Sequence, residues 1–398
     1  MHTKLWRVAS LFLLTELIST SVFAKSGVIH LENGIDITPE VAIDYSTNDN
    51  LLFAETDELN VQETIVTTAA DAELKYGRTD YILRYKSHWG TFDGSSADNY
   101  DDHFLRFDVN TVASDNDELS ASFFYRRLHE RRGTGLSQSF GADLPEPIEY
   151  DTAGVDVNWM YSISSERIWL ENEFNYNQKS YQNQPDLTVG GDINTFKVQS
   201  ALFWRTGKGS SVFINGSYTD FDYQDEDPGL LTRDSEEYRA LLGIRWARGE
   251  LGSGSVGVGY QRKNFATDVR EKFSGLSWSV GVEWHPLSRL SFSLNSTRAS
   301  VEPPLDGDFI QQVLHIIESD YFISDQLSAG LNFTYLDQKF VGIDRKEDSF
   351  VYGIDLAYKL RSNILLTLYY NRQDKTSSLA GFSFEQNVVG LQVKLGLK

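Results

Sequence analysis

The charged side chains of this sequence recur in a pattern that suits contact with water and polar solutes. They alternate with apolar residues, as Arg84 and Lys86 do with Leu83 and Tyr85. Because successive side chains on a strand point to opposite faces, the charged set is expected to share one face. Its predicted members are Arg84, Lys86, Arg106, Arg126, Glu171, Glu173, Lys197, Arg205, Arg239, Arg245, Glu283, Asp355 and Lys359, together with His88, Asp108 and Asp156.

Mixed guanidinium, ammonium and carboxylate groups on one wall would hydrate it and form weak hydrogen bonds with a passing solute. Their mixed signs predict a polar conduit without strong ion selectivity. For any single residue, a salt bridge that stiffens the wall is the alternative. As a set, they predict a water-filled interior.

Motifs that would indicate nucleotide chemistry lack the required context. Residues 252–257 (GSGSVG) match a dinucleotide fingerprint as a string, but Val256, Val258 and Tyr260 then continue as a strand where a helix is required. Residues 206–209 (TGKG) lack the upstream glycine and the following helix of a phosphate-binding loop. Both strings are predicted to be hairpin turns.

The sequence also lacks an organised set of residues for metal binding or for a catalytic nucleophile. Histidines such as His88, His129 and His285 fall on separate predicted hairpins, without paired ligand spacing. Residues 225–227 (DED) offer a calcium-binding loop, for which a solvated acidic loop is the alternative. No Ser/His/acid arrangement stands out. We therefore expect no enzyme activity, no cofactor and no metal site.

The elements that position the charged set are β-strands, most clearly between Leu276 and Arg298. Leu276, Trp278 and Val280 alternate with serine and glycine, and after a break at residues 286–289 the alternation resumes with Leu290. This pattern predicts a hairpin with one apolar and one polar face. The same pattern fills almost the whole chain.

Turns divide these strands into a regular series. Short polar turns are predicted near Gly77, Asp115, Ser165, Lys208, Gly252, Leu287, Ser324 and Ser362. Longer, more acidic connections lie between them, including residues 131–149. Short turns at one end and long loops at the other are typical of an outer-membrane β-barrel. The series predicts an all-β, antiparallel up-and-down barrel of about 18 strands, with 16 as the alternative because residues 309–323 alternate poorly.

A soluble β-propeller is the main competing fold, because its blades of about 40–45 residues match the repeat length. A blade has four short strands in that span, whereas this sequence has two long ones. The long strands therefore favour the barrel.

The first residues are typical of an export signal. Lys4 and Arg7 precede an apolar stretch from Val8 to Ile18, and residues 22–24 offer a cleavage site. We expect a signal peptide at 1–24, a periplasmic N-terminal segment at 25–38 and a barrel domain at 39–398, in the bacterial outer membrane.

Composition agrees with an exported barrel. The chain has no cysteine, which excludes disulfides and thiolate chemistry. Its formal charge of −21 argues against a nucleic-acid partner. A mean hydropathy of −0.36 excludes a helical membrane protein but not a barrel, whose alternating strands average out as polar. The 20 tyrosines and 24 phenylalanines suit the aromatic girdles of such barrels.

Four short motifs occur along the chain, at residues 45–50 (YSTNDN), 203–208 (FWRTGK), 281–286 (GVEWHP) and 384–387 (FEQN). In these motifs the sequence resembles a known family, the second family of β-barrel porins, found in capsule and exopolysaccharide loci of Gram-negative bacteria. The resemblance covers essentially the whole mature chain. It implies a barrel that helps polysaccharide to cross the outer membrane together with periplasmic export proteins.

Three functions follow as hypotheses. The first is a conduit for capsular or exopolysaccharide export, in contact with outer-membrane lipid and inserted by the barrel-assembly machinery. The second is a general diffusion porin. The third is a plugged structural or adhesive barrel whose acidic loops bind a surface partner.

Overall fold

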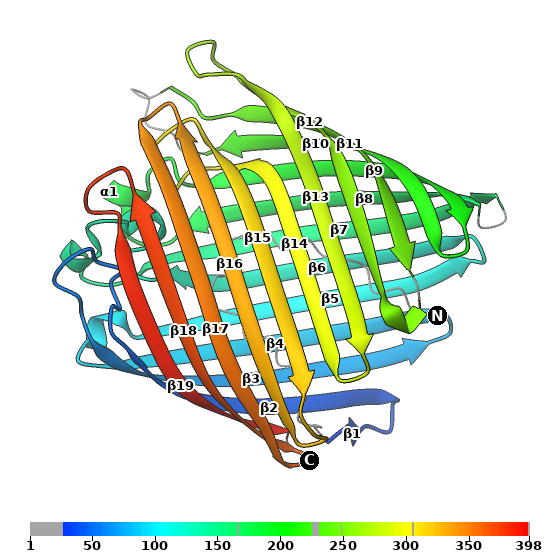
Figure 1. The fold of residues 1–398 in the computed structure, drawn as a ribbon, viewed down its shortest axis with the longest axis horizontal. Coiled ribbons are helices and arrows are strands. Elements are labelled where there is room, and N and C mark those ends of the chain that lie inside the picture. The colour runs from blue at the N-terminus through cyan, green and yellow to red at the C-terminus, as the bar shows by residue number, and fades with distance from the viewer. Residues whose placement is uncertain (1–26, 165–166, 225–230, 248, 305, 397–398) are drawn as a thin grey trace.

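The computed structural model describes residues 27–164, 167–224, 231–247, 249–304 and 306–396, which form one closed antiparallel β-barrel (Figure 1). Each long strand pairs with its neighbours in sequence, and the last strand pairs with the first long one from Gly396↔Glu40 to Val388↔Asn48. The barrel has 18 long strands, which confirms the predicted fold and strand number.

The strand bounds show how regular the barrel is. A two-residue strand, β1 (Ile29–His30), precedes the barrel and pairs with β2. The first half contains β2 (Ile35–Asn48), β3 (Val61–Tyr76), β4 (Thr79–Asp93), β5 (Tyr100–Ser114), β6 (Asp117–Glu130), β7 (Ile148–Ser164), β8 (Ile168–Tyr181), β9 (Ile193–Gly207) and β10 (Ser210–Tyr223). The second half contains β11 (Ser235–Ala247), β12 (Gly252–Phe265), β13 (Phe273–Leu287), β14 (Leu290–Val301), β15 (Phe309–Phe322), β16 (Leu327–Val341), β17 (Arg345–Arg361), β18 (Ile364–Ser377) and β19 (Phe384–Gly396).

Helical structure is confined to connections. The α-helix α1 (Pro185–Thr188) lies between β8 and β9, and 3₁₀ turns occupy Ser96–Asp98, Gly135–Ser137, Gly141–Asp143 and Gly249–Leu251. Among the described residues, no helix is long and apolar enough to cross a membrane.

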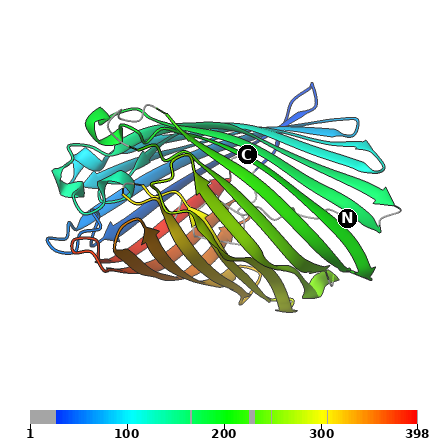
Figure 2. The ribbon, with the colours of Figure 1, turned by 90° about the horizontal axis from the view of Figure 1, so that it is seen from above.

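The connections differ at the two ends of the barrel, which we call the turn end and the loop end. Tight turns such as 77–78 and 208–209 join strands at the turn end, whereas long connections such as 49–60 and 131–147 gather at the loop end (Figure 2). Seven of the eight predicted turns fall at or beside observed turns. The eighth, near Ser165, lies outside the described residues, as does the predicted signal peptide at 1–24.

The N-terminal segment 25–38 contributes to the sheet from Ile29 onward. Ile29 pairs with Ile37, and the chain reverses at Gly34, whose φ of +83° favours glycine. Strand β2 begins at Ile35, before the expected start of the barrel domain at residue 39.

Apolar side chains cover one face of the strands along the whole barrel. On β10 and β11, Ile214 and its partner Leu242 are 58% and 65% exposed, although both are aliphatic. Leu83, Ile354 and Leu391 are exposed in the same way on other strands. Exposed aliphatic side chains on every part of a closed barrel are stable only against hydrocarbon, so this is the outer face.

Candidate functional site

The strand register places the predicted charged residues on the face opposite these apolar side chains. Arg84 pairs with Arg106 and Asp71, whereas the neighbouring Leu83 pairs with Phe107 and Ala72. The same alternation puts Glu171 and Glu173 beside inward positions of β9, and Arg239 opposite Ser217. That these side chains line a path for a solute stays a prediction.

Several predicted residues meet in a continuous row of charges along the inner wall of β3 to β7. Arg84 contacts Asp108 and lies 3.5 Å from an Asp71 oxygen. Arg106 Nε donates to Asp108 over 2.7 Å, and its Nη1 lies 3.7 Å from Asp156. Since each guanidinium lies between two carboxylates, charges of opposite sign alternate along the wall.

A second group lies near the turn end, on β8 to β11. Arg245 donates to both oxygens of Glu171 over 2.6 and 3.0 Å, although two strands separate them. The guanidinium lies 4.0 Å from the ring centroid of Phe203, a suitable distance for a cation–π contact. Lys197 and Glu173 form a neighbouring ion pair at 3.2 Å.

Beneath Arg245 lies a slab of three aromatic rings. Trp169 and Phe203 are stacked, with centroids 5.0 Å apart and planes at 5°, and Phe203 contacts Phe213 at 5.3 Å. The slab extends over β11 because Gly243 has no side chain: a Cβ there would lie 2.4 Å from the Phe213 ring. The aromatic rings and the Arg245–Glu171 pair thus form one surface, which we call the aromatic slab.

Three other predicted cations lie over aromatic rings. Lys86 and Arg126 lie over the rings of Phe104 and Phe124, at 5.7 and 4.7 Å. Arg205 lies 5.9 Å from the Trp169 ring. Within the described part of the chain, no ion pair within 4 Å involves Glu283, Asp355 or Lys359.

The loop end carries a feature that the sequence analysis did not predict. Residues 131–147, between β6 and β7, fold over the mouth of the barrel, and we call them the cap loop. Arg132 Nε and Nη2 donate to the two oxygens of Asp98 over 2.8 and 2.5 Å, and Nη1 donates to the Leu144 carbonyl. Both charged side chains are buried, at 7% and 4% exposure, and the bond to Asp98 raises the pKa of the Arg132 guanidinium.

The other side of the cap loop reaches a distant strand. Arg345, the first residue of β17, donates to Gln138 over 2.5 Å and pairs with Glu347 at 2.6 Å. Its guanidinium lies between the rings of Phe340 and Phe382, at 4.1 and 3.9 Å. The cap loop is therefore held at both sides by an arginine with fixed partners.

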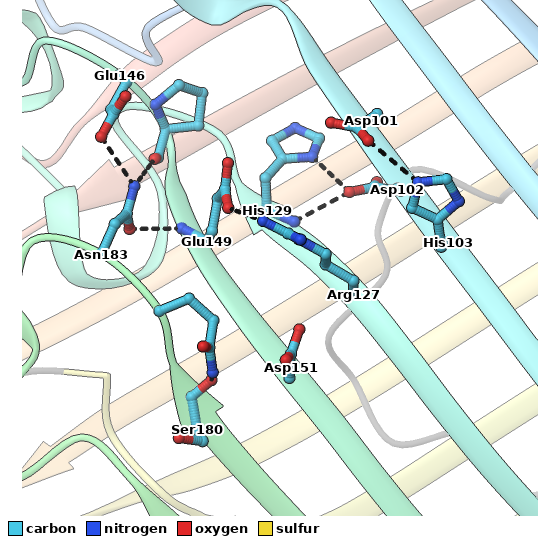
Figure 3. A network of polar contacts seen from close by, with 12 residues as sticks. Asp101, Asp102, His103, Arg127, His129, Glu146, Glu149, Asp151, Ser180 and Asn183 are labelled. Atoms are coloured by element: carbon cyan, nitrogen blue, oxygen red, sulfur yellow. Dashed lines mark hydrogen bonds and ion pairs between the residues drawn. The ribbon is translucent and has the colours of Figure 1, made fainter.

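Polar contacts also fix the base of the cap loop (Figure 3). The Asn183 amide, in the connection after β8, donates to the Pro147 carbonyl over 3.0 Å and accepts from the Glu149 backbone N–H over 2.8 Å. Nearby, Asp102 accepts from the backbone N–H of His129 over 3.0 Å. Close packing adds a further restraint: a Cβ on Gly133 would lie 1.7 Å from the Leu52 carbonyl oxygen.

The sequence contains a signal for this loop but not for its position. The sequence predicts a long connection at residues 131–149, and Pro145 and Pro147 fit that prediction. The contact between Gln138 and Arg345 joins residues 207 positions apart, so no local pattern predicts it.

The expectation that the protein has no metal site stays a prediction. No group of three or more His, Asp or Glu side chains suited to a metal occurs among the described residues. The acidic residues 225–227, considered as a calcium loop, lie outside the described part.

A closed barrel with an apolar outer face, a charged inner face and all its long loops at one end defines an outer-membrane β-barrel of the porin type. The turn end of such barrels faces the periplasm. Residues 36–397 match the family described as "Putative beta-barrel porin 2", and the chain belongs to this family.

Solved structures agree on the fold. OccK2 (OpdF) of Pseudomonas aeruginosa is similar with a TM-score of 0.50 and 11% identity, over 93% of this chain and 99% of that one. The FrpB iron transporter of Neisseria meningitidis, in its apoprotein form, is similar with a TM-score of 0.50 and 13% identity. The match covers 85% of this chain but only 62% of the FrpB chain. Identities this low show the fold alone. No curated protein matches the chain.

The buried pair of the cap loop gives a direct test of its anchoring. Replacing one partner of a buried ion pair costs about 3–5 kcal/mol because the other charge stays buried alone. In Arg132→Gln we expect amide hydrogen exchange in residues 131–147 to accelerate about a hundredfold or more, while strand amides keep their rates.

Arg127→Gln is the matched control. Arg127 pairs with Glu149 at 2.8 Å, but both side chains are about half exposed, and such pairs contribute only about 0–1 kcal/mol. Equal exchange rates in both variants would show that the Arg132–Asp98 pair does not anchor the loop.

Proposed function

We propose that this protein is a passive channel for hydrophilic solutes across the outer membrane, narrowed at its outer mouth by the cap loop. The observation that supports the proposal is the charged inner wall of β3 to β7, where Arg84, Asp108 and Arg106 alternate in sign. Barrels of 16 to 18 strands are wide enough to hold an aqueous channel. Charged groups on such a wall are stable when water fills the interior.

The pairing of these charges affects how the channel discriminates between anions and cations. Arg106 is shared between Asp108 and Asp156, and Arg245 is bound by Glu171 through two hydrogen bonds. A paired wall presents dipoles to a solute, so neither anions nor cations are strongly excluded. We therefore expect weak ion selectivity and passage of neutral polar molecules.

The cap loop would set the upper size of the solute. Its anchors, Arg132 on Asp98 and Arg345 on Gln138, attach it on two sides of the mouth. A loop held in this way leaves a solute only the space between the edges of the loop and the inner wall of the barrel.

Single-channel conductance in planar bilayers tests both parts of the proposal. We expect a steady, small open level for the unchanged protein. In the double variant Arg132→Ala/Arg345→Ala, the level should rise several-fold because the cap loop loses both anchors.

Arg127→Ala, which removes an exposed pair at the same end, should keep the original level. Absence of any conductance in all three proteins would contradict the channel and favour a plugged structural barrel. Equal conductance in all three would keep the channel and reject the cap loop as its restriction.

We infer polysaccharide export as a second candidate, in line with the resemblance to barrels of capsule and exopolysaccharide loci. The aromatic slab favours it, because a sugar ring has an apolar C–H face that packs on aromatic rings and hydroxyl edges that bond to charged groups. Trp169 would supply the ring and Glu171 the hydrogen-bond acceptor, while Phe203, only 1% exposed, supports Trp169 from beside it. This function would require periplasmic export proteins as partners, in addition to the barrel-assembly machinery.

Trp169 and Trp204 offer a matched pair of variants for this candidate. Ile168 is the register partner of Trp204, so the two tryptophans lie at nearly the same height; Trp204 is on the outer face, 63% exposed. Dextran oligomers should block the current of the unchanged channel, and Trp169→Ala should abolish most of the block while Trp204→Ala keeps it. Equal block in both variants would exclude the slab as a sugar site.

A further inference from the structure

The pairing between β13 and β14 stops short of the loop end. The last partners are Trp278 and Arg298, although β13 extends to Phe273 and β14 to Val301. Both ends remain paired on their other sides, since Phe273 pairs with Lys263 and Val301 with Ile310. The wall of the barrel is thus split over residues 273–277 and 299–301, which we call the seam.

The sequence gives a reason for the split. Pro303 and Pro304 lie one residue beyond the end of β14, and proline has no N–H with which pairing to β13 could resume. The end of β14 turns inward, as the yellow segment in Figure 2 shows. There Ser300 contacts Glu237, and Glu302 contacts Lys263 and accepts from the Tyr223 hydroxyl over 2.8 Å.

Side chains close the seam where the backbone does not. Arg239 reaches across β12 and donates from Nε to Ser277 Oγ over 2.7 Å and from Nη2 to the Trp278 carbonyl over 2.9 Å. Ser277 Oγ in turn donates to the Arg298 carbonyl over 2.7 Å. Among the described residues, no backbone hydrogen bond joins 273–277 to 299–301.

The joint between β19 and β2, where the barrel closes, has a different structure. Its strand pairing also ends early, at Val388↔Asn48, but Asp49 continues it with a backbone N–H donated to the Asn387 carbonyl over 3.2 Å. Asn50 adds a side-chain bond to the Glu385 carbonyl over 2.8 Å. The seam between β13 and β14 lacks such a backbone continuation.

Polar groups extend from the interior through the seam to the outer face. Lys263 is fully buried on the inner side, and Arg239 occupies the gap. On the outer side the Arg298 guanidinium lies 5.7 Å from the Trp278 ring, whose Nε1 donates to Ser296 over 2.9 Å. Exposed apolar residues such as Leu276 and Leu294 flank this polar strip.

We propose that the seam is a lateral portal, through which an amphiphile with an anionic head group and an acyl chain passes between the barrel interior and the lipid. The cationic groups Arg239, Lys263 and Arg298 would accompany the head group, while the chain lies against the apolar outer face. Opening requires only the breakage of side-chain hydrogen bonds, because backbone pairing is already interrupted. This route is independent of the axial channel proposed above.

Photolabelling in lipid vesicles tests the portal with the full chain. The probe is a fatty acid with a diazirine in its acyl chain, and labelled residues are mapped by mass spectrometry. We expect label on the inward positions Gly275, Ser277 and Ala299, in addition to outward positions around the whole barrel. In Arg239→Ala, label at the inward seam positions should increase several-fold.

Three controls make the outcome decisive. Arg372→Ala removes an arginine of β18 that pairs with Glu385 of β19, far from the seam, and should leave seam labelling unchanged. Ser277→Ala removes the Ser277 bonds to Arg239 and to the Arg298 carbonyl without deleting a charge. It should also increase labelling at the inward seam positions, and it gives a second test of the portal in case Arg239→Ala does not fold. A probe with the same chain and a trimethylammonium head should label the inward positions less.

Label restricted to outward positions, with no change in either seam variant, would overturn the portal. Equal labelling by both probes would reject the anionic head group. Because conductance through the axis does not depend on the seam, failure of either experiment leaves the other interpretable.

Discussion

The structure depends on one constraint: in hydrocarbon, every backbone N–H and C=O must be hydrogen-bonded within the protein. A sheet meets this requirement only by closing on itself, and the pairing of β19 with β2 closes this one. Once the sheet is closed, alternation along each strand separates the side chains into a lipid face and an inner face. The apolar outer side chains and the charged inner ones are consequences of that closure.

Register shifts in the strand pairing lie beside tight turns, as at Trp284/Leu287 and Lys359/Arg361, whereas the loop end carries buried ion pairs. There the cap loop buries Arg132 and Asp98 together, and the end of β14 turns inward with Glu302 on Lys263. Burial of charge is costly unless each group is paired and hydrogen-bonded, as these are. The turn end, in contrast, consists of tight connections such as 77–78 and 362–363. Tests of selectivity therefore belong at the outer mouth, where these buried pairs lie.

Local patterns in the sequence were sufficient for the barrel and its faces. Period-two alternation predicts strands such as β13 and β14, and turn residues predict their ends, so the predicted number of 18 strands agrees with the structure. The weak alternation of residues 309–323 has a physical cause, since β15 has Leu314 and Ile316 on its inner face as well as Val313 and Ile317 outside. The cap loop and the seam were not predicted. Both depend on contacts such as Gln138 with Arg345 and Arg239 with Ser277, which join residues far apart in the chain.

Lipid surrounds the barrel and water fills it, and chemical labelling of single positions tests both statements. Because the chain has no cysteine, single cysteines can be placed at the four consecutive β10 positions Ile214, Asn215, Gly216 and Ser217 and treated with a charged, membrane-impermeant thiol reagent in lipid vesicles. We expect the cysteines at 215 and 217, on the inner face, to react, and those at 214 and 216 to remain unmodified. Uniform reaction at all four positions, or reaction at 214 and 216 alone, would contradict this account.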